Sequence, residues 1–331
     1  LVLVRAEGPF LDNMSVPVRV VDLGAHRVLA SLPALVRYLK SVRPDAILSM
    51  MAYANIVALW AHRLAKVATR TIVSERSALP HPNNLTGQSP LRERILRALR
   101  RRYYPWADAI VAVSDGVADE LAFVARIPRE RIRVIYNPVM RPQLREAMRE
   151  PVDHPWFDEG QPPVLLAAGR LRPQKDFPTL IRAFAQVRRS RPLRLVILGE
   201  GTQRQELEEL VRRLGLESYV SMPGFVANPY AYMARSSLFV LSSNREGLPG
   251  ALIEAMCCGT PVIATDCPAG PREILCDGRF GQLIPIGEVD TMAQAIRKVL
   301  DEQLPSPPPD SWSRFEIDAV VDEYIDTLLG N

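Results

Sequence analysis

Two glutamates flank a glycine-rich loop in the stretch with the clearest chemical potential. Glu246 opens a Gly-Leu-Pro-Gly loop, and Glu254 follows eight residues later in a segment with helical spacing. The apolar run from Leu238 to Leu241 precedes the loop, so the stretch predicts a strand, a loop and a helix. The start of a helix after a parallel strand offers backbone N–H groups to a phosphate. The nearby carboxylates suit hydroxyl groups, so a nucleotide-sugar satisfies the whole arrangement.

A second polar loop follows another predicted strand. The apolar run from Val164 to Ala168 leads into Gly169, Arg170 and Lys175. Glycine permits a close approach of the backbone to a ligand, and the loop delivers two cations to the same sheet edge. The alternative is an unrelated pair of surface cations, just as Glu246 can be one of two solvated glutamates.

The first motif resembles the signature of retaining glycosyltransferase family 4, whose members have the GT-B fold. The resembling residues are Glu-Gly-Leu-Pro, Ile-Glu-Ala-Met and Gly-Thr-Pro-Val-Ile-Ala, with seven residues between the two glutamates. This resemblance implies that Glu246 hydrogen-bonds the donor sugar and that Glu254 binds the ribose. It further implies that Arg170 and Lys175 bind the diphosphate and neutralise charge on the leaving nucleotide. The other donor-binding residues that it implies are Gly169, Gly201, Phe225, Val226, Gly247, Leu248 and Gly250.

The resemblance also implies the kind of reaction. No Asp-x-Asp metal motif and no covalent nucleophile are evident, so we expect no metal ion and no cofactor besides the donor substrate, a UDP-sugar or a GDP-sugar. Attack on the same face as the leaving phosphate, with that phosphate as base, is what the family implies. Because backbone groups near Phe225 and Val226 would meet the base, the choice between uridine and guanosine stays open.

Strands alternating with helices predict an α/β protein of two Rossmann-like parallel-sheet domains. We expect the GT-B arrangement in which both domains face a cleft and a C-terminal helix returns to the first domain. The expected parts are an acceptor-side domain over 1–145, a donor domain over 155–310 and the closing helix over 311–331. The chain begins within an apolar run, so we expect the first domain to lack its first strand, glycine-rich loop and helix.

Composition places the chain among soluble globular proteins. No run of 18 apolar residues is present that would span a membrane, although 47% of the 331 residues are hydrophobic. The four cysteines, Cys257, Cys258, Cys267 and Cys276, fit neither a simple disulfide nor a zinc site. We interpret them as buried thiols and expect a cytoplasmic protein.

The two halves of the chain differ in charge. Residues 1–155 contain 23 Lys+Arg and 14 Asp+Glu, a net of +9, and residues 156–331 contain 18 and 23, a net of −5. The basic half includes residues 89–104, which predict a basic amphipathic helix able to lie on an anionic membrane surface. The alternative is a solvated helix that packs on its own domain. No nucleic-acid module is recognisable.

The acceptor side contains weaker signals. Glu75 and Arg76 follow a predicted strand and could meet an acceptor hydroxyl and a phosphate, or could form a local ion pair. His81 lies in a loop-like segment. The resemblance extends to the bacterial branch that builds surface polysaccharide and lipid-linked oligosaccharide. It therefore implies a glycan or lipid-linked acceptor and a location on the inner face of the plasma membrane.

Two other functions fit the same fold. A nucleotide-sugar epimerase or a phosphorylase would need further catalytic groups in the first half, or a cofactor lysine, and the sequence presents neither. A non-catalytic subunit that retains nucleotide-sugar binding would show vesicle binding without sugar transfer.

Overall fold

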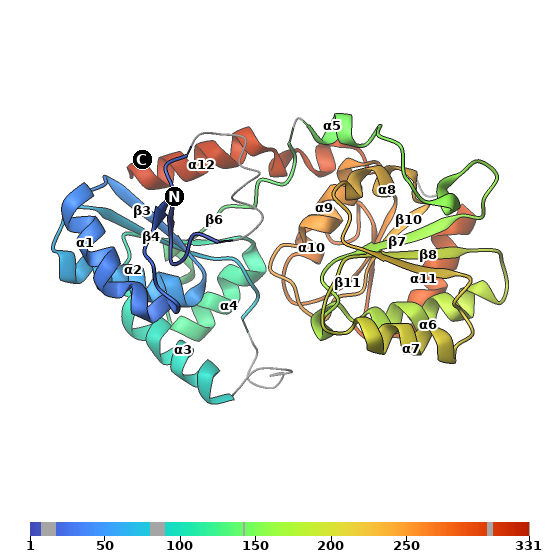
Figure 1. Ribbon diagram of the computed structural model, residues 1–331, viewed down its shortest axis with the longest axis horizontal. Helices are drawn as coiled ribbons and strands as arrows, with labels where there is room; N and C mark the ends of the chain where they lie inside the picture. Colours follow the sequence, from blue (N-terminus) through green and yellow to red (C-terminus); the bar gives the residue numbers. More distant parts are fainter. Residues whose placement is uncertain (8–17, 80–89, 142, 303–306, 331) are drawn as a thin grey trace. The chain divides into compact units, whose positions relative to one another are not determined.

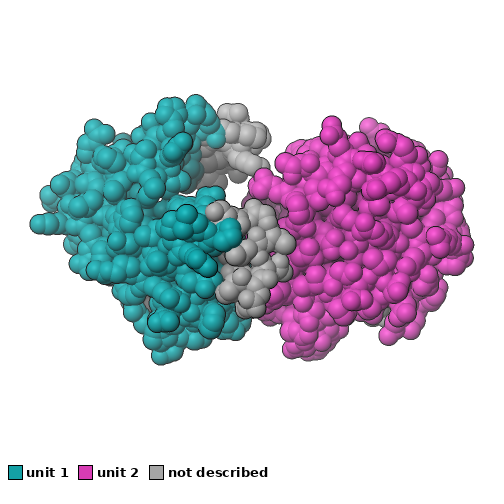
Figure 2. All heavy atoms as spheres, turned by 90° about the horizontal axis from the view of Figure 1, so that it is seen from below, with its two compact units in different colours: residues 1–135, 322–331 teal, residues 136–321 magenta. Residues whose placement is uncertain are grey.

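The computed structural model contains two compact units, each built on a parallel sheet (Figure 1). It describes residues 1–7, 18–79, 90–141, 143–302 and 307–330. Unit 1 comprises residues 1–135 and 322–331, and unit 2 comprises residues 136–321 (Figure 2). His81 and Ser89, and the Pro-rich residues 304–306, lie outside the described residues.

Unit 1 is organised around a four-stranded sheet with the order β3-β4-β5-β6. A separate parallel pair joins β1 to β2 near the N-terminus. The elements of this unit are β1 Val2–Leu3, β2 Val21–Asp22, α1 Leu32–Val42, β3 Ala46–Met50, α2 Ala52–Ala65, β4 Arg70–Glu75, α3 Pro90–Tyr103, β5 Ala109–Ala112, α4 Asp115–Ala125 and β6 Ile132–Val134. Ser114 caps α4 by accepting a hydrogen bond from the Val117 N–H, as its residue type predicts.

Unit 2 contains a six-stranded parallel sheet with the order β12-β11-β10-β7-β8-β9. Its elements are α5 Leu144–Ala147, β7 Val164–Ala168, α6 Phe177–Arg188, β8 Arg194–Leu198, α7 Arg204–Arg213, β9 Val220–Gly224, α8 Pro229–Arg235, β10 Leu238–Leu241, α9 Gly250–Cys257, β11 Val262–Thr265, α10 Pro271–Ile274, β12 Gln282–Ile284 and α11 Val289–Glu302. Apolar residues from β7, β8 and α6 form the centre of its core, where Leu165, Leu195 and Phe184 are fully buried. Because both faces of this sheet are covered, its strands are continuous apolar runs.

The last helix, α12 (Ile317–Leu329), begins in unit 2 and ends in unit 1. Its Thr327 is buried, and the Thr327 carbonyl accepts a hydrogen bond of 3.1 Å from Arg70. The Thr327 hydroxyl accepts a second bond, of 2.9 Å, from Arg133. The return of the C-terminal helix to the first sheet is therefore built from contacts within unit 1.

Several boundaries differ from the sequence-based expectation. The first unit ends at Ile135 rather than at residue 145, because residues 136–141 bond to the segment before α12; the Met140 N–H donates to the Phe315 carbonyl. Strand β2 is only two residues long, Val21–Asp22. Helix α8 was not expected, since its seven residues are too few for a periodic pattern to stand out.

Candidate active site

The predicted donor-binding residues follow the carboxyl ends of four adjacent strands. Parallel strands β10, β7, β8 and β9 are neighbours in the sheet of unit 2. The loops after them contain, in that order, Glu246, Arg170, Gly201 and Phe225. The carboxyl ends of parallel strands meet at one edge, which is where ligands bind in open α/β sheets. The sheet order thus gathers residues from four separate segments at one edge.

Lys175 and Glu246 are in direct contact at this edge. Lys175 Nζ lies 2.6 Å from Glu246 Oε1, and the Ser243 hydroxyl donates to the same oxygen at 2.6 Å. The side chain of Glu246 is only 9% exposed and that of Lys175 is 18% exposed. The predicted diphosphate-binding lysine and sugar-binding carboxylate therefore form an ion pair, and Ser243 holds the carboxylate in place.

Three hydrogen bonds to backbone carbonyl groups join the two loops that contain these residues. The Ser242 hydroxyl donates to the Lys175 carbonyl at 2.7 Å. The Asn244 N–H donates to the Gln174 carbonyl at 2.8 Å, and the Gln174 amide donates to the Arg245 carbonyl at 2.6 Å. Sequence analysis missed the role of these residues, which the polar Ser-Ser-Asn run after β10 could have suggested. They fix the geometry of the pair formed by Lys175 and Glu246.

Arg170 differs from Lys175 in its surroundings. It is exposed, and within the described part of the chain its guanidinium has no hydrogen-bond or ion-pair partner. An unpaired arginine can bind two oxygens of a phosphate at once. Of the two predicted diphosphate-binding cations, Lys175 is therefore paired and Arg170 is unpaired within the described residues.

Three glycines allow the loops after β7 and β8 to lie against each other. A Cβ at Gly199 would lie 2.1 Å from the Gly169 carbonyl oxygen, and a Cβ at Gly201 would lie 2.3 Å from the Leu171 carbonyl oxygen. A Cβ at Gly169 would lie 3.0 Å from the side chain of Lys175. Only glycine permits this packing, which places the lysine side chain over the end of β7.

Helix α9 begins directly after the glycine-rich loop. Pro249 occupies its N-cap position and makes no side-chain cap, so the N–H groups of the first turn have no side-chain acceptor there. Gly247 and Leu248 are buried, whereas Gly250 is partly exposed. Gly270 packs directly against the loop, because a Cβ there would lie 2.6 Å from Pro249 and 3.0 Å from the Gly247 carbonyl oxygen. Gly270 therefore fixes the position of the loop before α9, a role that was not predicted from the sequence.

Glu254 lies in α9 beside a tyrosine of α8. The Tyr230 hydroxyl donates to Glu254 Oε1 at 3.5 Å. Burial raises the pKa of Glu254 above its usual value, while burial and the adjacent carboxylate raise the pKa of Tyr230 to about 12. A half-buried carboxylate with one long hydrogen bond retains acceptor capacity for hydroxyl groups. Tyr230 was missed because α8 was not expected.

The loop after β9 is the most exposed part of the edge. Phe225 is 76% exposed, and Val226 is partly exposed. Arg204 of α7 organises the neighbouring turn by pairing with Glu200 at 2.5 Å and by donating to the Met222 carbonyl at 3.2 Å. Phe225 and Val226 thus follow a turn that Arg204 stabilises.

The four cysteines are free thiols. Cys257, Cys258 and Cys267 are buried free thiols, and burial is the main cause that raises the pKa of each to about 12. Cys276 is only partly buried, so the expectation of four buried thiols was wrong for this residue. Among the residues that the structure describes, no group of three His, Cys, Asp or Glu side chains is arranged to hold a metal ion.

In unit 1, Glu75 is part of a buried ion pair. Its Oε1 lies 2.9 Å from Arg100 and accepts a hydrogen bond of 2.5 Å from Tyr104. Glu75 is 3% exposed and Arg100 is 4% exposed. This geometry favours the local ion pair over contact with an acceptor hydroxyl, and the partner is Arg100 of α3.

Two family models match the chain. One, described as "Glycosyl transferases group 1", matches residues 150–314, and the other, described as "Glycosyltransferase Family 4", matches residues 3–140. The first covers the donor-side loops and the second covers most of unit 1. Together they account for both sheets.

Curated relatives act in glycan synthesis according to their names. An N-acetylgalactosaminyltransferase of Campylobacter jejuni, named for a diphospho-undecaprenol-linked acceptor, is 32% identical over 75% of this chain and 65% of its own length. The lipopolysaccharide core biosynthesis glycosyltransferase LpsE of Rhizobium meliloti is 29% identical over 69% of this chain and 66% of its own length. The chain thus spans less than two thirds of the length of these relatives.

Solved structures share the fold. HepE of Anabaena, crystallised with UDP-glucose, is 23% identical and superposes with a TM-score of 0.77 over 97% of this chain and 88% of its own. The lipopolysaccharide outer core galactosyltransferase WaaB superposes with a TM-score of 0.70 at 20% identity, over 95% of this chain and 84% of its own. The fold class is therefore GT-B, as the sequence predicted. With two matching family models, a shared fold and a relative at 32% identity, the chain belongs to the group 1 glycosyltransferases of family 4.

Proposed function

We propose that this protein is a retaining glycosyltransferase that moves a sugar from a nucleotide-diphosphate donor to an acceptor hydroxyl. The observation that carries the proposal is the contact between Lys175 and Glu246 at the carboxyl edge of the unit 2 sheet. A cation for phosphate and a carboxylate for sugar hydroxyls must lie side by side where the sugar–phosphate bond breaks. The proposed donor is a UDP-sugar or a GDP-sugar. The proposed base site near Phe225 and Val226 uses backbone groups, so it does not discriminate between uridine and guanosine.

Each residue has a defined part in this proposal. Lys175 and Arg170 hold the diphosphate and stabilise the charge that develops on it as the sugar leaves. Glu246 orients the sugar, Glu254 accepts hydrogen bonds from the ribose, and the first turn of α9 directs its N–H groups toward the phosphates. Gly169, Gly201, Gly247, Leu248 and Gly250 let the backbone approach the donor. Two cations supply the positive charge, so we propose that transfer needs no metal ion and survives treatment with EDTA.

We further propose that the acceptor is a glycan or a lipid-linked oligosaccharide. The Campylobacter relative is named for an undecaprenol-linked acceptor, and two other relatives are named for lipopolysaccharide synthesis. None of the described helices is long and apolar enough to cross a bilayer. The proposed location is the cytoplasmic face of the plasma membrane, which the basic helix within residues 89–104 would meet.

A thermal-shift panel with UDP, GDP and their sugar conjugates tests donor binding. A ligand that binds only the folded state raises its stability by mass action, so one nucleotide series should raise the Tm of the wild-type protein. Arg170→Ala should abolish most of that rise, whereas Arg213→Ala, which removes an exposed arginine of α7, should preserve it. Equal shifts in both variants would contradict the diphosphate role of Arg170.

Sugar transfer separates an enzyme from a nucleotide-binding subunit. Glu246→Gln and Glu246→Ala should lower kcat by about a hundredfold or more if the carboxylate orients the reacting sugar. Radiolabelled donor and a membrane-lipid extract provide the assay. Full turnover in both variants would exclude an essential role for Glu246, and nucleotide binding without transfer or donor hydrolysis in the wild type would favour the non-catalytic subunit.

A further inference from the structure

Helices α2 and α3 of unit 1 lie side by side and leave large apolar side chains in solvent. We propose that this surface, the α2–α3 face, docks on an anionic phospholipid bilayer. The inference rests on the proposed lipid-linked acceptor, and it names the surface that contacts the membrane and the lipid chemistry that this surface fits. Figure 1 shows the two helices next to each other in unit 1.

The apolar residues of α3 are divided between the core and the solvent. Leu96 is buried, as is Arg100 on the same helix. By contrast, Leu91 is 67% exposed and Ile95 is 50% exposed, while Leu64 at the end of α2 is 57% exposed. Exposed apolar groups of this size cost free energy in water and mark interaction surfaces when they cluster. The face that is available therefore includes α2 as well as α3.

Aromatic rings and arginines lie against one another at the C-terminal ends of α2 and α3. The rings of Trp60 and Tyr103 pack edge to face at 5.2 Å, and those of Tyr103 and Trp106 do so at 4.8 Å. The guanidinium groups of Arg63 and Arg102 lie over the Trp106 ring at 4.8 and 5.3 Å. Tryptophan and tyrosine concentrate at the headgroup level of bilayers, where one end of the ring is apolar and the other is wet. Arginine there meets lipid phosphates.

An arginine also packs on an aromatic ring at the N-terminal ends of α2 and α3. Arg92 donates a hydrogen bond of 2.7 Å to the Tyr53 hydroxyl and lies 4.9 Å from the centre of its ring. Just before them, Met51 is 71% exposed and has a φ of 79°. A bulky residue with positive φ is strained, and such strain persists where structure or function requires it. Here the strained turn holds an apolar side chain in solvent next to Tyr53.

The charge of the two helices suits only an anionic partner. Together α2 and α3 contain seven arginines and one carboxylate, Glu93. Glu93 is 9% exposed, so the exposed charges of the face are positive. Anionic lipid surfaces attract such basic segments, and salt screens this attraction.

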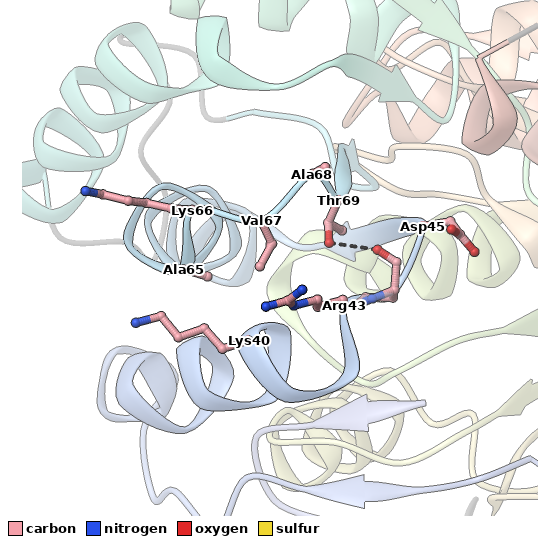
Figure 3. Close-up of a pocket in the computed structure, with 9 residues that line it drawn as sticks. Lys40, Arg43, Asp45, Ala65, Lys66, Val67, Ala68 and Thr69 are labelled. Atoms are coloured by element: carbon pink, nitrogen blue, oxygen red, sulfur yellow. Dashed lines mark hydrogen bonds between the residues drawn. The ribbon is translucent and has the colours of Figure 1, made fainter.

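A cationic pocket extends the face beyond the end of α2. Its volume is about 570 Å³, and its lining includes three cations, Lys40, Arg43 and Lys66, and one carboxylate, Asp45. Figure 3 shows that the side chains of Lys40 and Lys66 extend in the same direction from the ends of α1 and α2. Within the described residues none of the three has a side-chain partner. The pocket is suited to the phosphate of a lipid headgroup, although the same cations also complement the helix C-termini that border it.

Vesicle co-sedimentation tests the proposal on the full chain. The protein should sediment with vesicles that contain phosphatidylglycerol, much less with phosphatidylcholine alone, and less at high salt. The double variant Leu64→Glu/Leu91→Glu should weaken binding by roughly tenfold or more, because it places charge in the interface. Leu329→Glu is the matched control, since Leu329 of α12 is also 67% exposed, and it should bind as the wild type does.

Tryptophan quenching identifies the surface that touches lipid. Brominated phosphatidylglycerol should quench wild-type fluorescence, and Trp60→Phe/Trp106→Phe should lose most of that quenching while it still sediments. Trp156 and Trp312 of unit 2 then report the unquenched background. Quenching that survives in the double variant would overturn the assignment of this face.

Two further outcomes would also overturn the proposal. In the first, the Leu329→Glu control loses as much vesicle binding as the double variant. In the second, the wild-type protein does not bind anionic vesicles but elutes as a dimer, and Leu64→Glu/Leu91→Glu dissociates that dimer. The latter would make the face a contact between copies of the chain. A Tm shift with nucleotide, measured in parallel, shows whether the donor site remains intact. Loss of vesicle binding alone therefore refutes this inference without refuting the transferase.

Discussion

Among single residues, Glu254 differs from an ordinary surface glutamate in its burial and in its pKa. Burial raises its pKa, and its hydrogen bond from Tyr230 is long, at 3.5 Å. A raised pKa means that the folded state disfavours the carboxylate relative to the unfolded chain. Near neutral pH the charge therefore lowers stability, and this cost grows as the pH rises from the unfolded to the folded pKa. A residue kept at such a cost is a candidate for ligand binding.

We predict that Glu254→Gln separates stability from binding. Since the amide carries no charge to desolvate, the variant should match or exceed the wild-type Tm at pH 7, and the difference should shrink as the pH falls toward 4. The nucleotide-induced Tm shift should decrease, because glutamine replaces one of the two acceptor oxygens by a donor. Thermal unfolding across pH, with and without nucleotide, gives both quantities. A destabilised variant that binds nucleotide normally would contradict the ribose role.

At the scale of elements, the site depends on close packing of loops that follow neighbouring strands. The loops after β7 and β8 touch through Gly169 and Gly199, and the loops after β7 and β10 are joined by backbone hydrogen bonds. Packing of this kind transmits small displacements, because protein interiors have few voids to absorb them. The position of Lys175 therefore depends on residues that never touch a ligand.

Gly199→Ala should displace the loop that contains Arg170 and Lys175. The new methyl group would lie 2.1 Å from the Gly169 carbonyl oxygen, and backbone cannot move aside as a flexible side chain can. We expect nucleotide affinity to fall tenfold or more, by about 1.4 kcal/mol. Isothermal titration measures it. Gly215→Ala also has a positive φ, +66°, but open space around the Cβ, so it should keep its affinity and isolate the steric effect.

The buried ion pair of unit 1 gives a second test at this scale. Arg100→Ala would leave the buried Glu75 carboxylate with Tyr104 as its remaining partner among the described residues, which typically costs about 3–5 kcal/mol. Urea unfolding monitored by circular dichroism should show this loss. Arg97→Ala, at a partly exposed position on the same helix, should change stability by less than about 0.5 kcal/mol. A small effect of Arg100→Ala would mean that water reaches the pair.

At the scale of the whole molecule, two units divide the chemistry. Unit 2 contains every predicted donor-binding residue, whereas unit 1 contains the α2–α3 face and the buried pair of Glu75 and Arg100. The chain connects the units before Tyr136 and again within α12. Helix α12 therefore contributes to the stability of both units.

Thr327→Ala should weaken unit 1 without changing nucleotide binding. The substitution removes the hydroxyl that accepts from Arg133 at 2.9 Å, and a hydrogen bond to a charged group contributes about 1.5–3 kcal/mol. Chemical unfolding should show the loss, while the nucleotide-induced stabilisation stays the same. Asp322→Ala, at an exposed position of α12, is the control and should leave both unchanged. A reduced nucleotide effect in Thr327→Ala would show that α12 couples the units.

The sequence by itself determined most of the elements and the family. Strands β7 and β10 were predicted to within a residue or two, because buried parallel strands are short apolar runs bounded by glycine, serine and proline. The motif from Glu246 to Glu254 was recognisable because its parts lie within one strand–loop–helix unit. Local patterns of this kind need no knowledge of distant contacts.

Only the tertiary structure decided which residues meet. Lys175 and Glu246 touch because β7 and β10 are neighbours in the sheet, and strand order is not encoded in any local period. The same holds for Arg100 against Glu75, and for the face of α3 that stays exposed, since helical spacing marks an apolar side but not what covers it. The sequence thus predicted candidate residues, whereas long-range packing decided which residues contact one another.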